Sequence, residues 1–285
     1  MEKTDQPILR KPEWLRIRLT KAQDYSILRE VLERGQLHTI CESGACPNKG
    51  ECWGAGTATF MILGDICTRN CRFCNVKTGK PLPADPGEPE RVASAVSSMQ
   101  VKHCVLTSVD RDDLPDGGAG IWAETIKAVK AASPGTTIEA LIPDFKGSKQ
   151  DIQKVIEAGP EVISHNLETV KRLTSEVRLY ANYQTSLEVI EFIASSGTRA
   201  KSGIMLGLGE TEEEIFETMD DLLRVGCQVL TLGQYLQPTR RHLPVQKYVH
   251  PDDFKRYGEI ARKKGFRFVE SDPLVRSSYH AEKHL

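Results

Sequence analysis

The sequence predicts an α/β protein built as a partial (β/α)6 barrel of the TIM type, and three observations support this prediction. Apolar, strand-like runs alternate with amphipathic helical stretches about six times between residues 57 and 270, and such alternation favours parallel strands. Polar loops follow successive strands, at the ends where barrels of this type carry their chemistry. With 285 residues and 39% hydrophobic content, the chain is long enough to bury a core.

The pattern of apolar residues assigns each element of the barrel. Strands are expected at 58–63, 103–109, 136–141, 162–165, 199–205 and 228–232, with a short last strand at 266–270. Helices are expected at 24–34, 89–99, 120–131, 149–158, 183–195, 211–225 and 251–264. The chain therefore divides into an N-terminal extension (1–56), a barrel (57–270) and a C-terminal tail (271–285).

Three cysteines follow the first strand in a C-x3-C-x2-C run, Cys67, Cys71 and Cys74. Three thiols on so short a loop cannot all pair as disulfides, but they can surround one metal centre. Three ligands to a four-iron cluster leave one iron open to bind and activate another molecule. A zinc site would need a fourth ligand, for which His103 and Cys104 are the nearest candidates downstream. The run resembles the signature of the radical S-adenosylmethionine (SAM) superfamily.

A second set of three cysteines precedes the barrel in a C-x4-C-x5-C pattern, Cys41, Cys46 and Cys52. Three glycines and one proline mark this stretch as a loop without helix or strand, namely Gly44, Pro47, Gly50 and Gly54. A structural zinc site is one interpretation. Because the chain already carries one set suited to an iron–sulfur cluster, a second cluster is the favoured interpretation.

Polar residues after the later strands suit a cofactor that has an ammonium, a carboxylate, a ribose and an adenine. Carboxylates are available for the ammonium, and either Arg178 or Lys201 for the carboxylate. Asn166 with Glu168 suits the ribose, and the backbone of 205–209 could approach the adenine, although a lone G-x-G is a weak signal. The carboxylates in question are Asp110, Asp112 and Asp113.

Composition narrows the class of protein and its setting. The net charge of −1 argues against nucleic acid as an obligatory partner, and no apolar run approaches the ~20 residues that cross a bilayer. The N-terminus lacks the apolar core of a secretion signal. Cys104 and Cys227 are expected to be buried free thiols, and no histidine is expected to bind metal. Reduced cysteines that serve metal centres indicate the cytoplasm.

Several motifs in order along the chain resemble the lipoyl synthase family within the radical SAM superfamily. The second cysteine loop and the ending Arg276-Ser-Ser-Tyr279 are the parts specific to that family. The other matching motifs are Lys11-Pro-Glu-Trp-Leu15, the C-x3-C-x2-C loop with Phe73, Thr107-Ser-Val-Asp-Arg-Asp-Asp-Leu114, His165-Asn-Leu-Glu-Thr169 and Gly203-Ile-Met-Leu-Gly207.

The resemblance implies an enzyme that inserts two sulfur atoms, at C6 and C8 of an octanoyl chain on a carrier-protein lysine. Cys67, Cys71 and Cys74 would hold a catalytic [4Fe–4S] cluster that binds and cleaves SAM. A second [4Fe–4S] cluster on the other three cysteines would supply the sulfur and be consumed. Ser278 is expected to complete its coordination, with Ser277 as the alternative. Asn166, Glu168 and Arg178 are expected to contact SAM.

The same resemblance implies several protein partners. These are an acidic, octanoylated lipoyl domain, an electron donor such as flavodoxin or ferredoxin, and an iron–sulfur carrier that rebuilds the consumed cluster. Two basic stretches are candidates for docking the acidic domain. The first is an N-terminal arm, Arg10, Lys11, Arg16, Arg18 and Lys21, and the second is residues 240–267, with nine Lys or Arg against three acids.

Three other functions compete with this interpretation. Biotin synthase also inserts sulfur by radical chemistry, but the resemblance to it ends at the C-x3-C-x2-C loop. A methylthiotransferase that acts on RNA would need an appended basic domain. A zinc-stabilised scaffold without catalysis is the alternative from a different class of protein, and a colourless, air-stable, zinc-containing protein would favour it.

Overall fold

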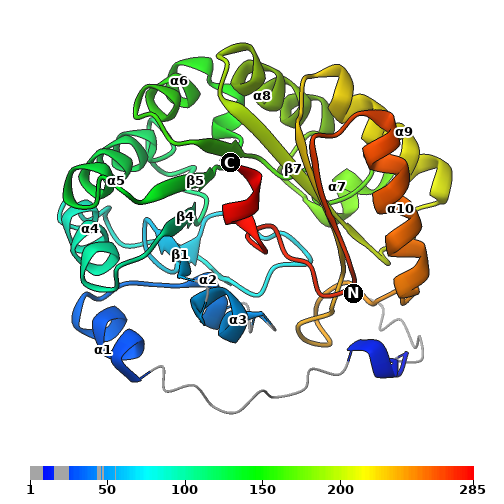
Figure 1. Cartoon of the computed structure of the whole chain (residues 1–285), viewed down its shortest axis with the longest axis horizontal. Coiled ribbons are helices and arrows are strands. Elements are labelled where there is room, and N and C mark those ends of the chain that lie inside the picture. The colour runs from blue at the N-terminus through cyan, green and yellow to red at the C-terminus, as the bar shows by residue number, and fades with distance from the viewer. Residues whose placement is uncertain (1–8, 16–25, 44–45, 47, 55) are drawn as a thin grey trace.

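The computed structural model describes residues 9–15, 26–43, 46, 48–54 and 56–285. Its main sheet has seven parallel strands that curve into an open barrel, and helices cover the outer face (Figure 1). The strand order is β1-β4-β5-β6-β7-β8-β9, so that chain order and spatial order agree. Within the described residues, β1 and β9 are the two edges of the sheet.

The strands and helices have the following bounds. The main-sheet strands are β1 (Thr57–Ile62), β4 (His103–Ser108), β5 (Thr137–Leu141), β6 (Val162–Ser164), β7 (Arg199–Leu206), β8 (Val229–Gln234) and β9 (Phe268–Ser271). A separate pair consists of β2 (Ile66–Cys67) and β3 (Lys77–Thr78). The helices are α1 (Ser26–Arg34), α2 (Ile40–Ser43), α3 (Lys49–Gly54), α4 (Glu88–Ser98), α5 (Ala119–Ala132), α6 (Lys149–Glu157), α7 (Thr174–Val177), α8 (Tyr183–Ser195), α9 (Glu212–Arg224) and α10 (Pro251–Lys264). Four 3-10 turns are η1 (Glu13–Leu15), η2 (Phe145–Gly147), η3 (Lys171–Leu173) and η4 (Ala281–His284).

The six predicted β–α units are confirmed, and β9 confirms the short last strand. The predicted bounds of α8 and α10 agree with the structure, and the other barrel elements differ by at most two residues. Local sequence explains this agreement. At the start of α9, Thr211 accepts from the backbone N–H of Glu214, while the Glu214 carboxylate accepts from that of Thr211. At the end of α10, Gly265 adopts a φ of 123°, which favours glycine.

The prediction that the second cysteine loop contains no helix is wrong, because α2 and α3 lie within it. Gly50 and Gly54 belong to α3, whose first turn includes a hydrogen bond from the Cys52 N–H to the Asn48 carbonyl at 3.0 Å. A glycine costs only about 1 kcal/mol in a helix, so tertiary contacts can outweigh it. One such contact is the 2.7 Å hydrogen bond from the Asn48 side chain to the Leu274 carbonyl.

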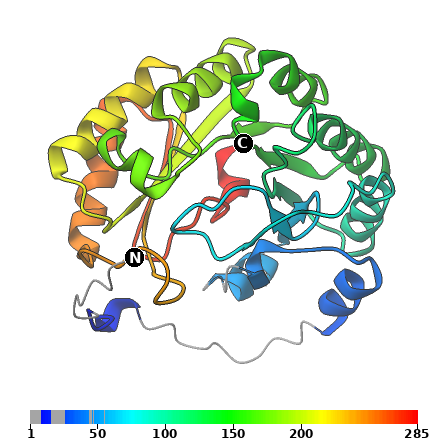
Figure 2. The same ribbon diagram turned by 180° about the vertical axis from the view of Figure 1, so that it is seen from behind.

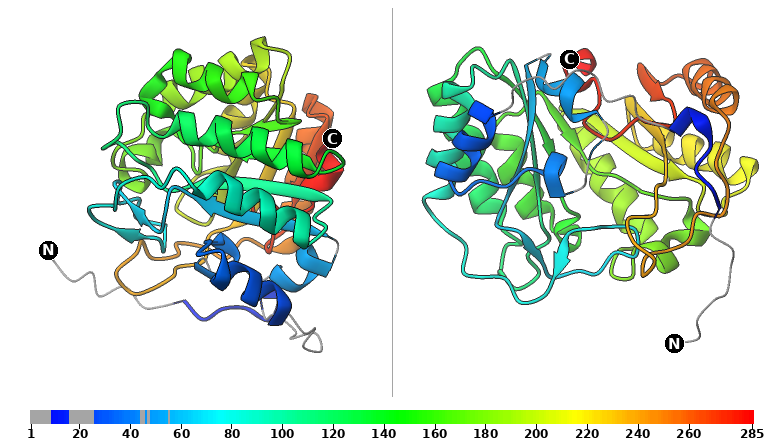
Figure 3. Two further views of the ribbon diagram at one scale, coloured as in Figure 1. Left: turned by 90° about the vertical axis from the view of Figure 1, so that its left-hand side faces the viewer. Right: turned by 90° about the horizontal axis from the view of Figure 1, so that it is seen from below.

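The C-terminal segment, here called the tail (residues 272–285), lies inside the arc of strands and not on its outer face (Figures 1 and 2). Seen from below, it lies beside the short N-terminal helices α2 and α3, and β9 lies on its other side (Figure 3, right). The tail therefore occupies the gap between the two sheet edges. No helix in the described part of the chain has both the length and the apolar character that crossing a membrane requires.

Candidate active site

A cavity of about 570 Å³ lies at the carboxyl ends of the barrel strands. Its volume is in the range of small-molecule sites, about 300–1,000 Å³. Cys67, Cys71 and Cys74 all line it, as do Asn166, Glu168 and Arg178. Two segments far apart in the sequence, the loop after β1 and the tail, thus border the same space, because the tail contributes its residues 275–277.

The environment of Cys67 suits a thiolate bound to iron. Its sulfur accepts backbone N–H groups from Arg69 at 3.4 Å and from Asp110 at 3.3 Å. Burial, and next the Asp110 carboxylate, raise the pKa of Cys67 to about 11. Burial also raises the pKa of Cys71 to about 12, although the Arg178 guanidinium opposes the shift. The bare thiols therefore stay protonated at neutral pH, and a metal must displace the protons to bind.

The three sulfurs do not form a site for a single metal ion. Among the described residues, no group of three His, Cys, Asp or Glu side chains is placed to hold one ion. The thiolates of a four-iron cluster bind different irons and need not meet at one point. The alternative zinc ligands lie elsewhere: His103 and Cys104 are buried at the amino end of β4.

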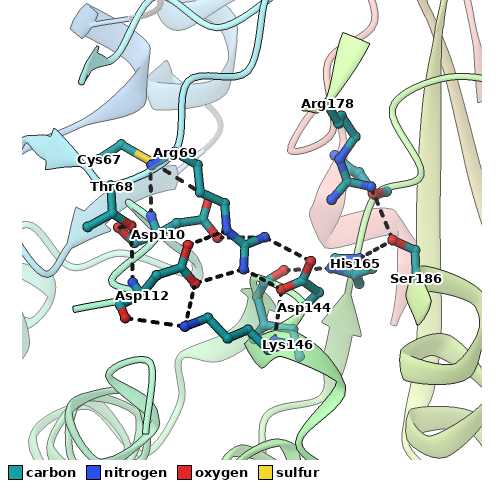
Figure 4. Close-up of polar contacts among 12 residues, drawn as sticks. Cys67, Thr68, Arg69, Asp110, Asp112, Asp144, Lys146, His165, Arg178 and Ser186 are labelled. Carbon is teal, nitrogen blue, oxygen red and sulfur yellow. Dashed lines mark hydrogen bonds and ion pairs between the residues drawn. The ribbon is translucent and has the colours of Figure 1, made fainter. Parts of the chain in front are cut away.

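An arginine between the first two cysteines holds this loop to the barrel (Figure 4). Arg69 is 6% exposed and makes paired hydrogen bonds to Asp112 at 2.7 and 2.9 Å and to Asp144 at 2.8 and 2.7 Å. Asp110 lies 3.5 Å away. Burial alone would raise the pKa of Asp144, but hydrogen bonds and charge from Arg69 outweigh it and lower that pKa to about 2.

Sequence reasoning missed this clamp of Arg69 and Asp144. The rule that functional groups follow strand ends would have found Asp144, which comes three residues after β5. No local signal distinguishes Arg69 from Arg72, which lies on the same loop but is exposed.

We predict that Arg69→Met destabilises the protein by about 3–5 kcal/mol, because it leaves the buried Asp144 carboxylate and the partly buried Asp112 carboxylate without their cation. The midpoint Tm should fall by roughly 5–15 °C, as measured by thermal unfolding under anaerobic conditions. The matched control is Arg72→Met. Its side chain is 44% exposed and contacts Glu176 at 3.4 Å, so its loss should cost less than about 1 kcal/mol. Equal Tm values for the two variants would contradict the role of the clamp.

The three predicted SAM contacts line the cavity together. The Asn166 amide donates to Glu168 at 3.1 Å, while Asn166 Oδ1 is buried and has no hydrogen-bond partner among the described residues. Burial raises the pKa of Glu168, and nearby Arg178 opposes the shift. Arg178 donates to the Asn166 carbonyl at 3.0 Å and to the Ser186 hydroxyl at 3.2 Å. The unpaired buried acceptor and the placed cation fit a polar ligand with a donor and a carboxylate.

Several other candidates for cofactor contacts are not free to make them. Lys201 does not line the cavity; it is fully buried at the amino half of β7, where it pairs with Glu139 at 2.8 Å. Asp112 is held by Arg69 as described, and Asp113 by Arg111. In the 205–209 segment Met205 lines the cavity, but the N–H groups of residues 207 and 208 donate to a nearby carboxylate, that of Glu210, at 2.5 and 2.9 Å.

The second cysteine set lies against the tail. Burial raises the pKa of Cys52 to about 12, with Cys46 and Cys41 as the next causes, which places the three thiols near one another. Burial lowers the pKa of Arg276, and the group that opposes this shift is Cys46. The Tyr279 hydroxyl contacts both carboxylate oxygens of Glu51 at 3.2 Å. Residues 276–279 therefore lie beside the cysteine loop.

None of the eight cysteines forms a disulfide. Cys104 and Cys227 are buried, as predicted, and line no cavity described here.

Comparison with known proteins agrees with this geometry. The model of the radical SAM superfamily matches residues 61–222. A lipoyl synthase of Bacteroides fragilis is 61% identical over 277 residues, which cover 97% of this chain and 96% of that protein. A mitochondrial lipoyl synthase of Nematostella vectensis is 56% identical and covers 96% of this chain and 94% of that protein.

Among solved structures, the Streptococcus suis protein SuiB bound to its precursor peptide SuiA superposes with a TM-score of 0.60. It is 13% identical, over 93% of this chain and 57% of that chain. At this identity the likeness concerns the fold alone.

Proposed function

Because the chain belongs to the lipoyl synthase family of the radical SAM superfamily, we propose that its cavity inserts two sulfur atoms, at C6 and C8 of a protein-bound octanoyl-lysine. The observation that carries this proposal is that the C-x3-C-x2-C cysteines and the tail beside the second cysteine set border one cavity. When bound there, the cluster and SAM supply a 5′-deoxyadenosyl radical that takes hydrogen from an unactivated C–H bond.

The chain's own residues would bind and orient these groups. Cys67, Cys71 and Cys74 hold the first [4Fe–4S] cluster, and the clamp of Arg69 fixes their loop. Arg178 faces the SAM carboxylate, while Asn166 and Glu168 accept from its hydroxyl groups. The support for these roles is the shared cavity, the buried unpaired Asn166 Oδ1 and the charge of Arg178 near Cys71.

A second [4Fe–4S] cluster would be held by Cys41, Cys46, Cys52 and Ser278, and would be the source of the sulfur. The support is the mutual proximity of the three thiols and the contact of the tail with their loop. Ser277 lines the cavity and Ser278 does not. The two adjacent serines therefore differ in their position relative to the cavity, and in this proposal Ser278 is the ligand of the second cluster.

The function is tested with anaerobically reconstituted protein, SAM, dithionite and an octanoylated lipoyl domain. We expect mass spectrometry to show a product in which two sulfurs replace two hydrogens of the octanoyl chain, with 5′-deoxyadenosine formed alongside. Dethiobiotin, the substrate that biotin synthase would require, should give no sulfur-containing product. Conversion of dethiobiotin, or zinc in place of iron in the purified protein, would contradict the proposal.

The carrier domain would dock at the rim of the cavity through exposed cations on the segment after β8. Gln237 and Pro238 of this segment line the cavity, and His242 Nε2 contacts the Cys74 carbonyl at 2.9 Å. Its exposed cations are Arg240, Arg241 and Lys247. Other cations of 240–267 are engaged elsewhere: Arg256 pairs with Glu212, Lys264 pairs with Asp220, and Arg262 donates to the Val269 carbonyl. Of the N-terminal arm, Lys11 lines the cavity, whereas Arg16, Arg18 and Lys21 lie outside the described residues.

We predict that the double charge reversal Arg240→Glu/Arg241→Glu raises KM for the octanoylated domain about tenfold with little change in kcat, because it repels an acidic partner. The matched control is Lys255→Glu/Lys263→Glu, two exposed cations on α10. The difference in KM between the wild type and the Arg240→Glu/Arg241→Glu variant should disappear at 1 M salt, where the Debye length is ~3 Å. Equal KM values for the two double variants would remove the rim as the docking site.

Three further expectations remain proposals. An electron donor such as flavodoxin or ferredoxin would reduce the first cluster, and an iron–sulfur carrier would rebuild the second. A reducing cytoplasmic setting is supported by the eight cysteines, none of which forms a disulfide.

A further inference from the structure

A buried polar cluster lies inside the barrel beneath the carboxyl-end cavity, because Glu139 and Lys201 come two residues before Leu141 and Gly203, which line that cavity. Lys201 and Glu139 are fully buried and 2.8 Å apart, and Ser164 donates to the second Glu139 oxygen at 3.0 Å. Lys201 Nζ also lies 3.3 Å from Nδ1 of His284, which is 1% exposed. We call Glu139, Lys201 and His284 the C-terminal latch. The residues proposed for the reaction include none of the three.

The latch requires the tail to be docked. A lysine ammonium only donates hydrogen bonds, so His284 Nδ1 must accept and the imidazole is neutral, with its proton on Nε2. A buried cation needs its donors satisfied, because an unsatisfied charged donor in the interior is costly. Arg199 adds a second bond, from its guanidinium to the His284 backbone carbonyl at 2.6 Å. Release of the tail would thus either expose the Lys201 ammonium to water or leave it buried without its hydrogen bond to His284.

The tail contacts the barrel strands along its length between the cavity and the latch. At its start the Gln234 N–H donates to the Pro273 carbonyl at 3.2 Å. At Gly233 an added Cβ would lie 2.2 Å from the Val275 carbonyl, so the tail packs directly on β8. Near its end, Thr57 of β1 donates to Glu282 at 3.1 Å. The tail therefore spans from strand ends at the cavity to strand starts at the latch, and only a few residues separate Ser278 from η4.

We propose that the C-terminal latch holds the tail in register, and that His284 is a positioning residue for the second cluster although it touches neither cluster nor SAM. The inference rests on the proposed role of Ser278 as a ligand of that cluster. Because the tail is fixed at both ends, Ser278 lies beside the cysteine loop. Without Ser278, that loop would offer the second cluster only three of its four ligands.

The test compares three variants of the full chain after anaerobic reconstitution: His284→Ala, His284→Gln and Lys283→Ala. The amide oxygen of Gln can accept from Lys201, and Lys283 is an exposed neighbour on η4. Hydrogen exchange of peptides from 272–285 should accelerate at least tenfold in His284→Ala and remain near wild type in the other two. Iron and sulfide should fall by about half in His284→Ala alone, while SAM cleavage persists.

The outcomes separate the latch from the proposed function. If hydrogen exchange of the tail in His284→Ala is unchanged, the latch does not hold the tail. If exchange is faster but both clusters and sulfur insertion are intact, His284 is not a positioning residue for the second cluster. If Ser278→Ala keeps two clusters and full sulfur insertion while its tail stays protected, the ligand role of Ser278 falls, which is a failure of the proposed function. Should His284→Ala not fold, Arg199→Met removes the second anchor and should give the same pattern more weakly.

Wild-type protein provides a test without mutation. Burial, and next the charge of Lys201, lower the pKa of His284 to about 3, whereas in a released tail its pKa would be the ordinary ~6.5. Between these values only the released tail binds the proton, so docking has full strength above pH ~6.5 and weakens as pH falls. The charged or titratable groups that face His284 are Lys201, Arg199, His103, His280 and Glu270. Glu139 pairs with Lys201, and Glu282 lies two residues before His284 on η4.

From pH 7.5 to 5.5 the opening of the tail, corrected for intrinsic exchange, should increase about tenfold. The His284→Gln variant carries all the other titratable groups and should lack this increase. An equal increase in both proteins would assign the pH dependence to those other groups and count against the latch.

Discussion

Replacing Cys67, Cys71 and Cys74 by Ala should abolish SAM cleavage and leave roughly half of the iron. These thiols border the cavity that contains Arg178 and Asn166, and no other cysteine lines it among the described residues. Without them the proposed cluster has no ligands at the place where SAM would bind. The measurement is 5′-deoxyadenosine formed from SAM and dithionite, together with iron and sulfide per chain.

The matched variant replaces Cys41, Cys46 and Cys52 by Ala and removes the same number of thiols from the other set. We expect SAM cleavage to remain detectable and lipoyl formation to be lost, again with about half of the iron. The first set lines the cavity, whereas the second lies beside Arg276 and Tyr279 and does not line it, so each loss should be local. If both triple variants were folded and equally inactive in SAM cleavage, the division of labour between the two sets would be wrong.

Replacing Ser278 by Ala should eliminate lipoyl product while SAM still binds. Within the part of the chain that the structure describes, no hydrogen bond involves the hydroxyl of Ser278 or of Ser277. A serine that only capped a turn would cost ~1 kcal/mol on removal, with little effect on chemistry. A ligand of the second cluster should instead show a loss of product and a changed iron–sulfur spectrum. Both are measured on the reconstituted protein.

Two further variants make the serine test specific. Ser277→Ala removes the hydroxyl of the neighbouring serine, a residue that lines the cavity, and should retain sulfur insertion. Ser278→Cys should keep the second cluster but hold its iron more firmly through a thiolate, and so be impaired in releasing sulfur. Full lipoyl formation by Ser278→Ala at normal cluster content would assign the ligand to Ser277 instead.

The contacts of the N-terminal extension show how sequence and structure differ in what they reveal. Cysteine spacing alone predicts two separate sets, since spacing is a local property. The same local reasoning excluded helices from the second loop, and α2 and α3 contradict it. The Asn48 side chain bonds to Leu274, 226 residues away. No pattern within the loop could have predicted a contact at that separation.

The choice between Arg178 and Lys201 shows the same limit at the cavity. Both are cations in loops or strands of the barrel, and sequence left them as alternatives. Arg178 follows α7 near the end of β6 and lines the cavity, whereas Lys201 is the third residue of β7 and faces Glu139 and His284. Lys201 lies on the same face of β7 as Gly203 and Met205, which line the cavity, so its depth along the strand and not the face it occupies keeps it out of the cavity.

The sequence by itself determined the barrel, the two cysteine sets and the family, because periodicity, spacing and motif order are properties of short stretches. Only the tertiary structure decided that Arg69 is clamped by Asp112 and Asp144, and that the tail runs from the cavity to a buried Lys201. These arrangements join residues 43–83 positions apart. A buried charge is stable only where its partners converge in space, and that convergence exists only in the folded barrel with the tail in place.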